Sequence, residues 1–161
     1  MERNAEPAAL VSGLAEDLAR IGAVKSRLTS EEAVAAPPWG GWSANEILWH
    51  IRATADVYGE HIARILTEDE PRWRHKSPRA RMKKSRYDAI PFAESFGAFE
   101  TQRTELLALL RTAPPGAWGR AAIVKVEKRD WRLTLHERVR GFFQHEAVHC
   151  AEMEALVNEH P

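Results

Sequence analysis

Apolar residues recur at steps of three and four along most of this chain, and this spacing limits the fold more than any other feature of the sequence. Such a pattern lines one face of an α-helix and leaves a polar face toward solvent. It predicts four amphipathic helices, over residues 7–28, 43–67, from Pro91 to the Pro114–Pro115 pair, and from residue 134 to near the C-terminus. We therefore expect an all-α four-helix bundle, formed as a single domain over residues 1–161.

Helix starts are marked by a hydroxyl residue followed three positions later by glutamate, the spacing of a capping box. In this arrangement the hydroxyl accepts from the backbone N–H of the glutamate, and the glutamate reaches back to the first residue. Three pairs have this spacing: Thr29 with Glu32, Ser43 with Glu46, and Thr134 with Glu137. They predict a short turn of helix after the first long helix, and well-defined starts for the second and fourth.

The periodicity fails between Thr67 and Pro91, which leaves a long connection between the second and third helices. Residues 72–86 of this connection contain eight Lys or Arg and no acidic residue. We expect a solvated basic loop here, able at most to hold an anionic partner. Residues 123–127 read as a short extended piece, but too few strand candidates surround them to predict a sheet.

Composition excludes several classes of protein. The 23 Lys and Arg balance 23 Asp and Glu, so a strongly cationic nucleic-acid binder is disfavoured. Cys150 is the single cysteine, which rules out an internal disulfide and a Cys-rich zinc site. No apolar run is long enough to cross a bilayer, and the first residues lack the features of a signal peptide. We expect a cytoplasmic protein that does not bind membranes.

The segment from His145 to His149 reads H-E-x-x-H on a predicted helix, where residues four apart share a face and can hold one metal ion. Zinc peptidases with this motif need a third ligand further along the chain. Here Glu152 and Ala155 stand where the extended peptidase motif has its glycine and its third histidine. The peptidase interpretation therefore fails, and a third ligand must come from upstream.

His50 on the second predicted helix is the natural third ligand, because bundles build metal sites from facing helices. If the second and fourth helices are antiparallel, His50 lies about 25 Å and the His145/His149 pair about 20 Å from the same end of the bundle, at about 1.5 Å per residue. His61 lies about 16 Å further along the helix than His50, so it cannot share the ion.

These residues resemble the DinB-like (DinB/YfiT) metalloprotein superfamily. Residues 41–51, with Gly41-Trp42-Ser43 leading to His50, look like the segment that carries the family's first ligand, and residues 143–149 look like the one that carries its second and third. The resemblance spans nearly the whole chain, except for the basic connection and the piece near Val124. It implies that His50, His145 and His149 bind one divalent transition metal: Ni, Zn, Fe or Mn.

Three further features have competing interpretations. Glu146 lies near the centre of the helical stripe, where an unpaired carboxylate would be costly, so it is either a water-activating base, a partner of a ligand, or half of a salt bridge. Cys150 is more simply a small buried apolar residue than a nucleophile. The tryptophans Trp39, Trp42 and Trp49 are expected to pack in the core or, for Trp42, against Ile47 as a hydrophobic staple, rather than form a platform for substrate.

The resemblance implies a metal-dependent enzyme, and we expect a thiol-dependent S-transferase that uses a low-molecular-weight thiol and a small-molecule substrate. Two alternatives stay open. One is a metal-dependent hydrolase in which Glu146 acts as the catalytic base. The other is a non-catalytic binding protein that uses residues 72–86 for an anionic partner, although tight binding of nucleic acid is not expected. A homodimer is a further candidate assembly.

Overall fold

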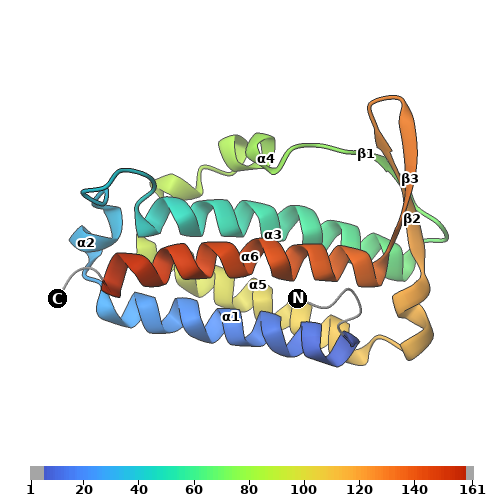
Figure 1. Ribbon diagram of the computed structural model, residues 1–161, viewed down its shortest axis with the longest axis horizontal. Coiled ribbons are helices and arrows are strands. Elements are labelled where there is room, and N and C mark those ends of the chain that lie inside the picture. Colours follow the sequence, from blue (N-terminus) through green and yellow to red (C-terminus); the bar gives the residue numbers. More distant parts are fainter. Residues whose placement is uncertain (1–5, 159–161) are drawn as a thin grey trace.

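The computed structural model describes residues 6–158 and consists of four long helices with a small sheet at one end (Figure 1). Residues 1–5 and 159–161 of the predicted domain lie outside the described residues. The long helices are α1 (Pro7–Arg27), α3 (Ala44–Thr67), α5 (Phe92–Thr112) and α6 (Leu135–Asn158). Each begins and ends close to its predicted position, so the four-helix bundle is confirmed.

The three predicted capping boxes are present and set where helices begin. The Ser43 backbone N–H donates to the Glu46 carboxylate at 2.9 Å, and the Glu46 N–H donates to Ser43 Oγ at 3.3 Å. The same exchange starts α6, where the Thr134 N–H donates to Glu137 at 2.8 Å. A third box, at Thr29, starts the short helix α2 (Ser30–Val34). Local sequence alone therefore defines these starts.

The helices have an unusual order of directions. In Figure 1, α1 and α6 run one way and α3 and α5 run the other. Helices α3 and α6 are therefore antiparallel, as predicted, and they pack against each other. Because α3 and α5 are parallel, the chain between them has to travel back along the bundle, which explains the length of this connection.

The basic connection is not the loop that the sequence predicted. It contains strand β1 (Arg72–Arg74), helix α4 (Pro78–Ser85) and the 3-10 helix η1 (Tyr87–Ala89). Trp49 on α3 anchors α4 by donating its indole N–H to the Met82 carbonyl at 2.8 Å. The prediction was wrong because this anchor comes from another helix and cannot be seen in the local sequence. A local signal did exist in Ser77 followed by Pro78, which cap and begin α4.

The expectation that the chain forms no sheet was also wrong. Strands β2 (Ala121–Val126) and β3 (Arg129–Thr134) form an antiparallel hairpin, and β1 pairs with β2 in parallel, giving the order β1-β2-β3. The sequence hid the outer strands because both are rich in charged residues and mostly exposed. The hairpin turn is equally hidden, since its left-handed residue is Glu127 (φ 55°) instead of Gly or Asn.

The apolar core fills the space between the four long helices in two clusters. One, nearer the sheet, includes Leu14, Leu107 and Phe142, and the other, nearer α2, includes Ile51 and Phe99. Helix α1 packs tightly on α6 at Gly13, where a Cβ atom would lie 2.6 Å from the Phe143 ring. Within residues 6–158, no helix is both long and apolar enough to span a membrane.

Candidate metal centre

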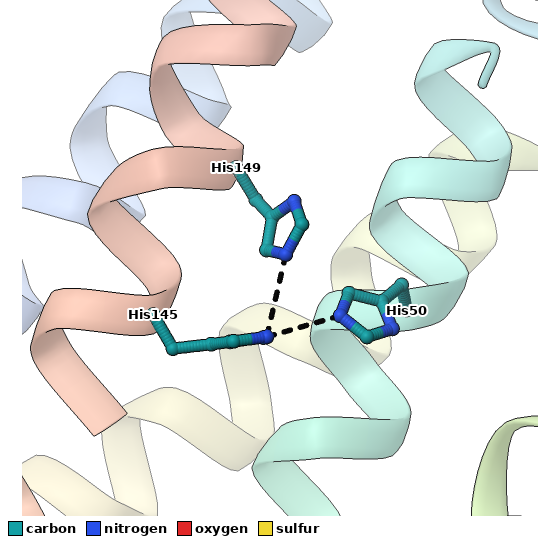
Figure 2. A group of neighbouring side chains, drawn as sticks. All are labelled: His50, His145 and His149. Carbon is teal, nitrogen blue, oxygen red and sulfur yellow. Dashed lines mark hydrogen bonds between the residues drawn. The ribbon is translucent and has the colours of Figure 1, made fainter. Parts of the chain in front are cut away.

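Three histidines meet between α3 and α6, level with each other along the bundle (Figure 2). His50 comes from the second turn of α3, and His145 and His149 are one turn apart on α6. His145 Nε2 lies 3.1 Å from His50 Nε2 and 3.3 Å from His149 Nε2. The antiparallel helices thus bring together the residues that the sequence singled out. His61 lies elsewhere, with its ring stacked on Trp73 at 4.2 Å between centroids.

The separations among these nitrogens suit one ion. Nitrogens at about 2.1 Å from a tetrahedral ion lie roughly 3.4 Å apart, close to the two measured separations. One candidate ligand atom from each of the three side chains lies within 4.8 Å of the others. Among the described residues, this is the only group of three or more His, Cys, Asp or Glu side chains that meets the geometry for a metal ion. The arrangement therefore fits the group that the sequence implies.

Burial favours the neutral form of His50 and His145, and the neutral imidazole is the form that binds a metal. The pKa of His50 is lowered to about 4, first by burial and then by the neighbouring charges of His149, His145 and Arg79. The pKa of His145 is lowered as well, again mainly by burial. The Nε2 lone pairs of His50 and His145 are therefore available at neutral pH, and Arg79 of α4 lies within electrostatic reach of His50.

Glu152 orients His149, and sequence reasoning missed this role. The Nδ1 atom of His149 lies 2.7 Å from Glu152 Oε2, one turn further along α6. A carboxylate at Nδ1 favours a proton on that nitrogen, which leaves the Nε2 lone pair for a metal. The signal available in the sequence was the i,i+3 spacing of a histidine and an acid on one helix face.

Glu146 is engaged on the other side of α6. It forms a fully buried ion pair with Arg103 of α5, whose guanidinium donates to both carboxylate oxygens, to Oε2 at 2.6 Å. The same guanidinium also donates to the Leu14 carbonyl of α1 at 3.1 Å. Residues adjacent on a helix point about 100° apart, so Glu146 faces α1 and α5 while His145 faces α3. Of the roles left open by the sequence, the structure supports the salt bridge.

The tryptophans near the site divide into two groups. Trp49 is partly buried and holds α4, in line with a packing role. Trp39 and Trp42 are 51% and 38% exposed and line a cavity of about 500 Å³ beside His149. Core packing was therefore wrong for Trp39, whereas Trp42, expected as a staple on Ile47, lines the same cavity as that residue. The Trp42 ring lies 5.1 Å from that of His50 and 6.3 Å from that of His149, between centroids. Trp42 is therefore part of the wall of the candidate centre.

Cys150 is buried against α1, where its thiol lies 3.9 Å from the Asp17 carbonyl. Burial, followed by the nearby Asp17 and Glu146 carboxylates, raises the pKa of this thiol far above its usual value. A thiol held in its neutral form is a poor nucleophile. The structure thus agrees with a packing role for Cys150.

Comparisons with known proteins point to one family. A sequence model of the DinB superfamily matches residues 14–153. No curated protein matches the sequence significantly. Among solved structures, YfiT from Bacillus subtilis, described as a probable metal-dependent hydrolase with an unusual four-helix bundle topology, is 18% identical with a TM-score of 0.74, over 99% of this chain and 89% of that chain.

A second similar structure is a mycothiol-dependent maleylpyruvate isomerase. It is 12% identical with a TM-score of 0.73, over 93% of this chain, and the present chain spans 61% of its length. At these identities the two likenesses show a shared fold.

Proposed function

This chain belongs to the DinB superfamily, and from that premise we propose that it is a metal-dependent enzyme with His50, His145 and His149 as the ligands. The observation that carries the proposal is the convergence of three imidazoles from two antiparallel helices. A divalent ion held by three protein ligands keeps a position open and lowers the pKa of a thiol or water bound there. Nickel, zinc, iron and manganese all accept imidazole ligands.

We propose thiol transfer as the reaction, with a low-molecular-weight thiol as one substrate. The hydrolase mechanism that the sequence suggested needs Glu146 to take a proton from water. In the structure, however, the Glu146 carboxylate is paired with Arg103 in the core. Transfer from a thiol does not depend on this base, because a thiol ionises far more readily than water. The likeness to the mycothiol-dependent isomerase supports the same choice.

The chain's own residues supply orientation and charge for such a reaction. Glu152 holds the His149 ring in place through Nδ1, and Trp42 shields one side of the cluster. Helix α4 places the positive charge of Arg79 within reach of His50. We propose that Arg79 attracts the anionic carrier of the thiol, since unlike charges raise the local concentration of a substrate.

Hydrolysis remains the second candidate, favoured by the likeness to YfiT. A third candidate, a non-catalytic protein that binds an anion through residues 72–86, is favoured by the exposed basic side chains of α4. Activity measurements distinguish these two candidate functions from thiol transfer. Turnover of esters with no thiol requirement would indicate hydrolysis, and metal-independent binding of anions with no turnover would indicate the binding protein.

Metal content is the first test. Untagged protein should contain about one transition-metal ion per chain. His50→Ala, His145→Ala and His149→Ala should each lose the ion but keep their helical circular dichroism, because the apolar core does not depend on the site. His61→Ala is the matched control and should keep the metal. Substoichiometric metal that nickel, zinc, iron or manganese cannot restore would refute the proposal.

The reaction is tested with metal-loaded protein, several low-molecular-weight thiols and an electrophilic aryl halide. Arg79→Ala should raise KM for the thiol about three- to tenfold with little change in kcat, as expected for lost electrostatic attraction. Arg129→Ala, on the exposed strand β3, is the matched control. An unchanged KM in Arg79→Ala would exclude this role for α4.

A further inference from the structure

A cavity of about 500 Å³ opens beside the candidate centre, where the chain turns from α2 into α3. Its walls are Trp39 and Trp42 from the turn, Ile47 from α3, and Leu156 from α6. We propose that this cavity binds an uncharged aromatic or bulky aliphatic group of the second substrate, the one that receives the thiol. The inference rests on the proposed function for its role in catalysis, but the binding itself requires only the cavity.

The turn that carries the two tryptophans has a backbone conformation that requires glycine. Gly40 and Gly41 have φ angles of 83° and 99°, a region that residues with a side chain rarely adopt. The Gly40 N–H also donates to the Pro37 carbonyl at 3.0 Å, which tightens the turn. Trp39 and Trp42 therefore flank a turn whose conformation depends on its glycines. The cavity that the two tryptophans line is part of the folded structure.

Both tryptophans at this turn expose part of their surface to solvent. Trp39 is 51% exposed and Trp42 is 38% exposed, although indoles are usually well buried. A planar apolar ligand lying against them would remove this surface from water and add ring stacking. The cavity volume of about 500 Å³ falls within the usual range for small-molecule pockets, about 300–1,000 Å³. The cavity therefore suits a group that consists of a single ring or of two fused rings.

Charge in the cavity selects against anions. The titratable side chains among the described residues that line it are His149 and Glu152, and neither Lys nor Arg is among them. The basic helix α4 lies along the outer side of α3, away from α6 (Figure 1). Among the lining side chains, an anionic ring would meet the Glu152 carboxylate and no Lys or Arg, so a neutral ring should bind more tightly.

The cavity is continuous with the histidine cluster. His149 lines the cavity and belongs to the cluster, and the Trp42 ring stacks at 27° to the His149 ring with 6.3 Å between centroids. A group bound against Trp42 would therefore lie beside the His149 ring, at the edge of the cluster. This placement is the one that an acceptor needs when the thiol is held by the cluster.

The test uses the full chain labelled with 5-fluorotryptophan. The chain has six tryptophans, each of which should give its own ¹⁹F signal, and Trp→Phe variants assign the signals. Titration with 2-naphthol should shift the Trp39 and Trp42 signals. Trp131, 57% exposed on β3, is an internal control and should not shift. Shifts of Trp131 as large as those of Trp39, or no shift of either turn tryptophan, would overturn the proposal.

Affinity provides a second measurement. Trp39→Ala should weaken 2-naphthol binding about 5- to 10-fold, the loss expected for one aromatic wall, whereas Trp131→Ala should leave the dissociation constant unchanged. Naphthalene-2-sulfonate should bind more weakly than 2-naphthol. Equal affinity of wild type and Trp39→Ala, or tighter binding of the sulfonate, would refute the assignment.

Both titrations are repeated with His145→Ala, which removes a candidate ligand but no wall of the cavity. Retained 2-naphthol binding in this variant supports the cavity whether or not the wild type binds metal. Loss of metal binding in wild type would refute the proposed function alone, and loss of the ¹⁹F shifts would refute the cavity alone.

Discussion

The buried ion pair between Arg103 and Glu146 leads to the sharpest prediction about stability. The two side chains are 0% and 1% exposed, so neither charge is compensated by bulk water. Arg103→Met removes one charge while keeping an unbranched chain, and it leaves Glu146 buried without its partner. Breaking one side of such a pair is expected to cost about 3–5 kcal/mol of unfolding free energy.

This loss is large for a chain of this size. Single domains are stable by about 5–15 kcal/mol, and about 1 kcal/mol corresponds to roughly 2–4 °C in Tm at this length. Arg103→Met should therefore lower Tm by about 6–20 °C. Removing both charges, in Arg103→Met with Glu146→Leu, should recover most of the loss because no unpaired charge remains.

Urea unfolding followed by circular dichroism measures these changes, and the two single variants with the double variant form a mutant cycle. The exposed pair Arg64–Glu68, at 30% and 45% exposure, provides the control. Glu68→Gln should change the free energy of unfolding far less than Arg103→Met does, because an exposed ion pair contributes little to stability. A double variant as unstable as Arg103→Met, or one that no longer binds metal, would refute the separation of Glu146 from the histidine cluster.

Two further predictions follow from other contacts. Gly13→Ala should destabilise by about 1–3 kcal/mol because the new methyl group would press on Phe143, whereas the open position Gly141 should accept alanine without loss in the same urea assay. The pKa of Asp17 is raised, first by burial and then by the charge of Glu146. The contribution of the Asp17 carboxyl group to stability is therefore present below its unfolded pKa of about 3.9, and it is lost as the pH rises through the higher folded pKa. Asp17→Asn should therefore be at least as stable as wild type at pH 7, with this advantage shrinking toward pH 4, and a less stable variant at pH 7 would contradict the reasoning.

Local sequence signals predicted those parts of the molecule that depend on neighbours along the chain. The boxes at Ser43 and Thr134 are complete within four residues, so they mark the starts of α3 and α6 correctly. His145 and His149 share a face because of helix periodicity alone. Placing His50 opposite them required the further inference that the helices are antiparallel.

Features that depend on distant partners were missed. Nothing within α4 reveals that Trp49 holds it, and nothing within β1 reveals its pairing with β2. The partner of Glu146 was visible only indirectly, since Arg103 occupies a position in the apolar stripe of its helix. An arginine and a glutamate on two apolar stripes are a usable sign of a buried ion pair.

The long separations along the chain also determine how the protein is made. His50 and His145 are 95 residues apart, and Arg20 contacts Glu154 across 134 residues. A ribosome adds about 5–20 residues per second, so roughly 5–19 s pass between synthesis of the first and second histidine of the cluster. Until α6 (Leu135–Asn158) is made, the earlier helices α1, α3 and α5 lack the helix that covers them, and their apolar stripes are open to aggregation and to chaperones. Docking of α6 closes the core and completes the histidine cluster in one event, so a metal ion held by all three proposed ligands would be acquired late in the biogenesis of this protein.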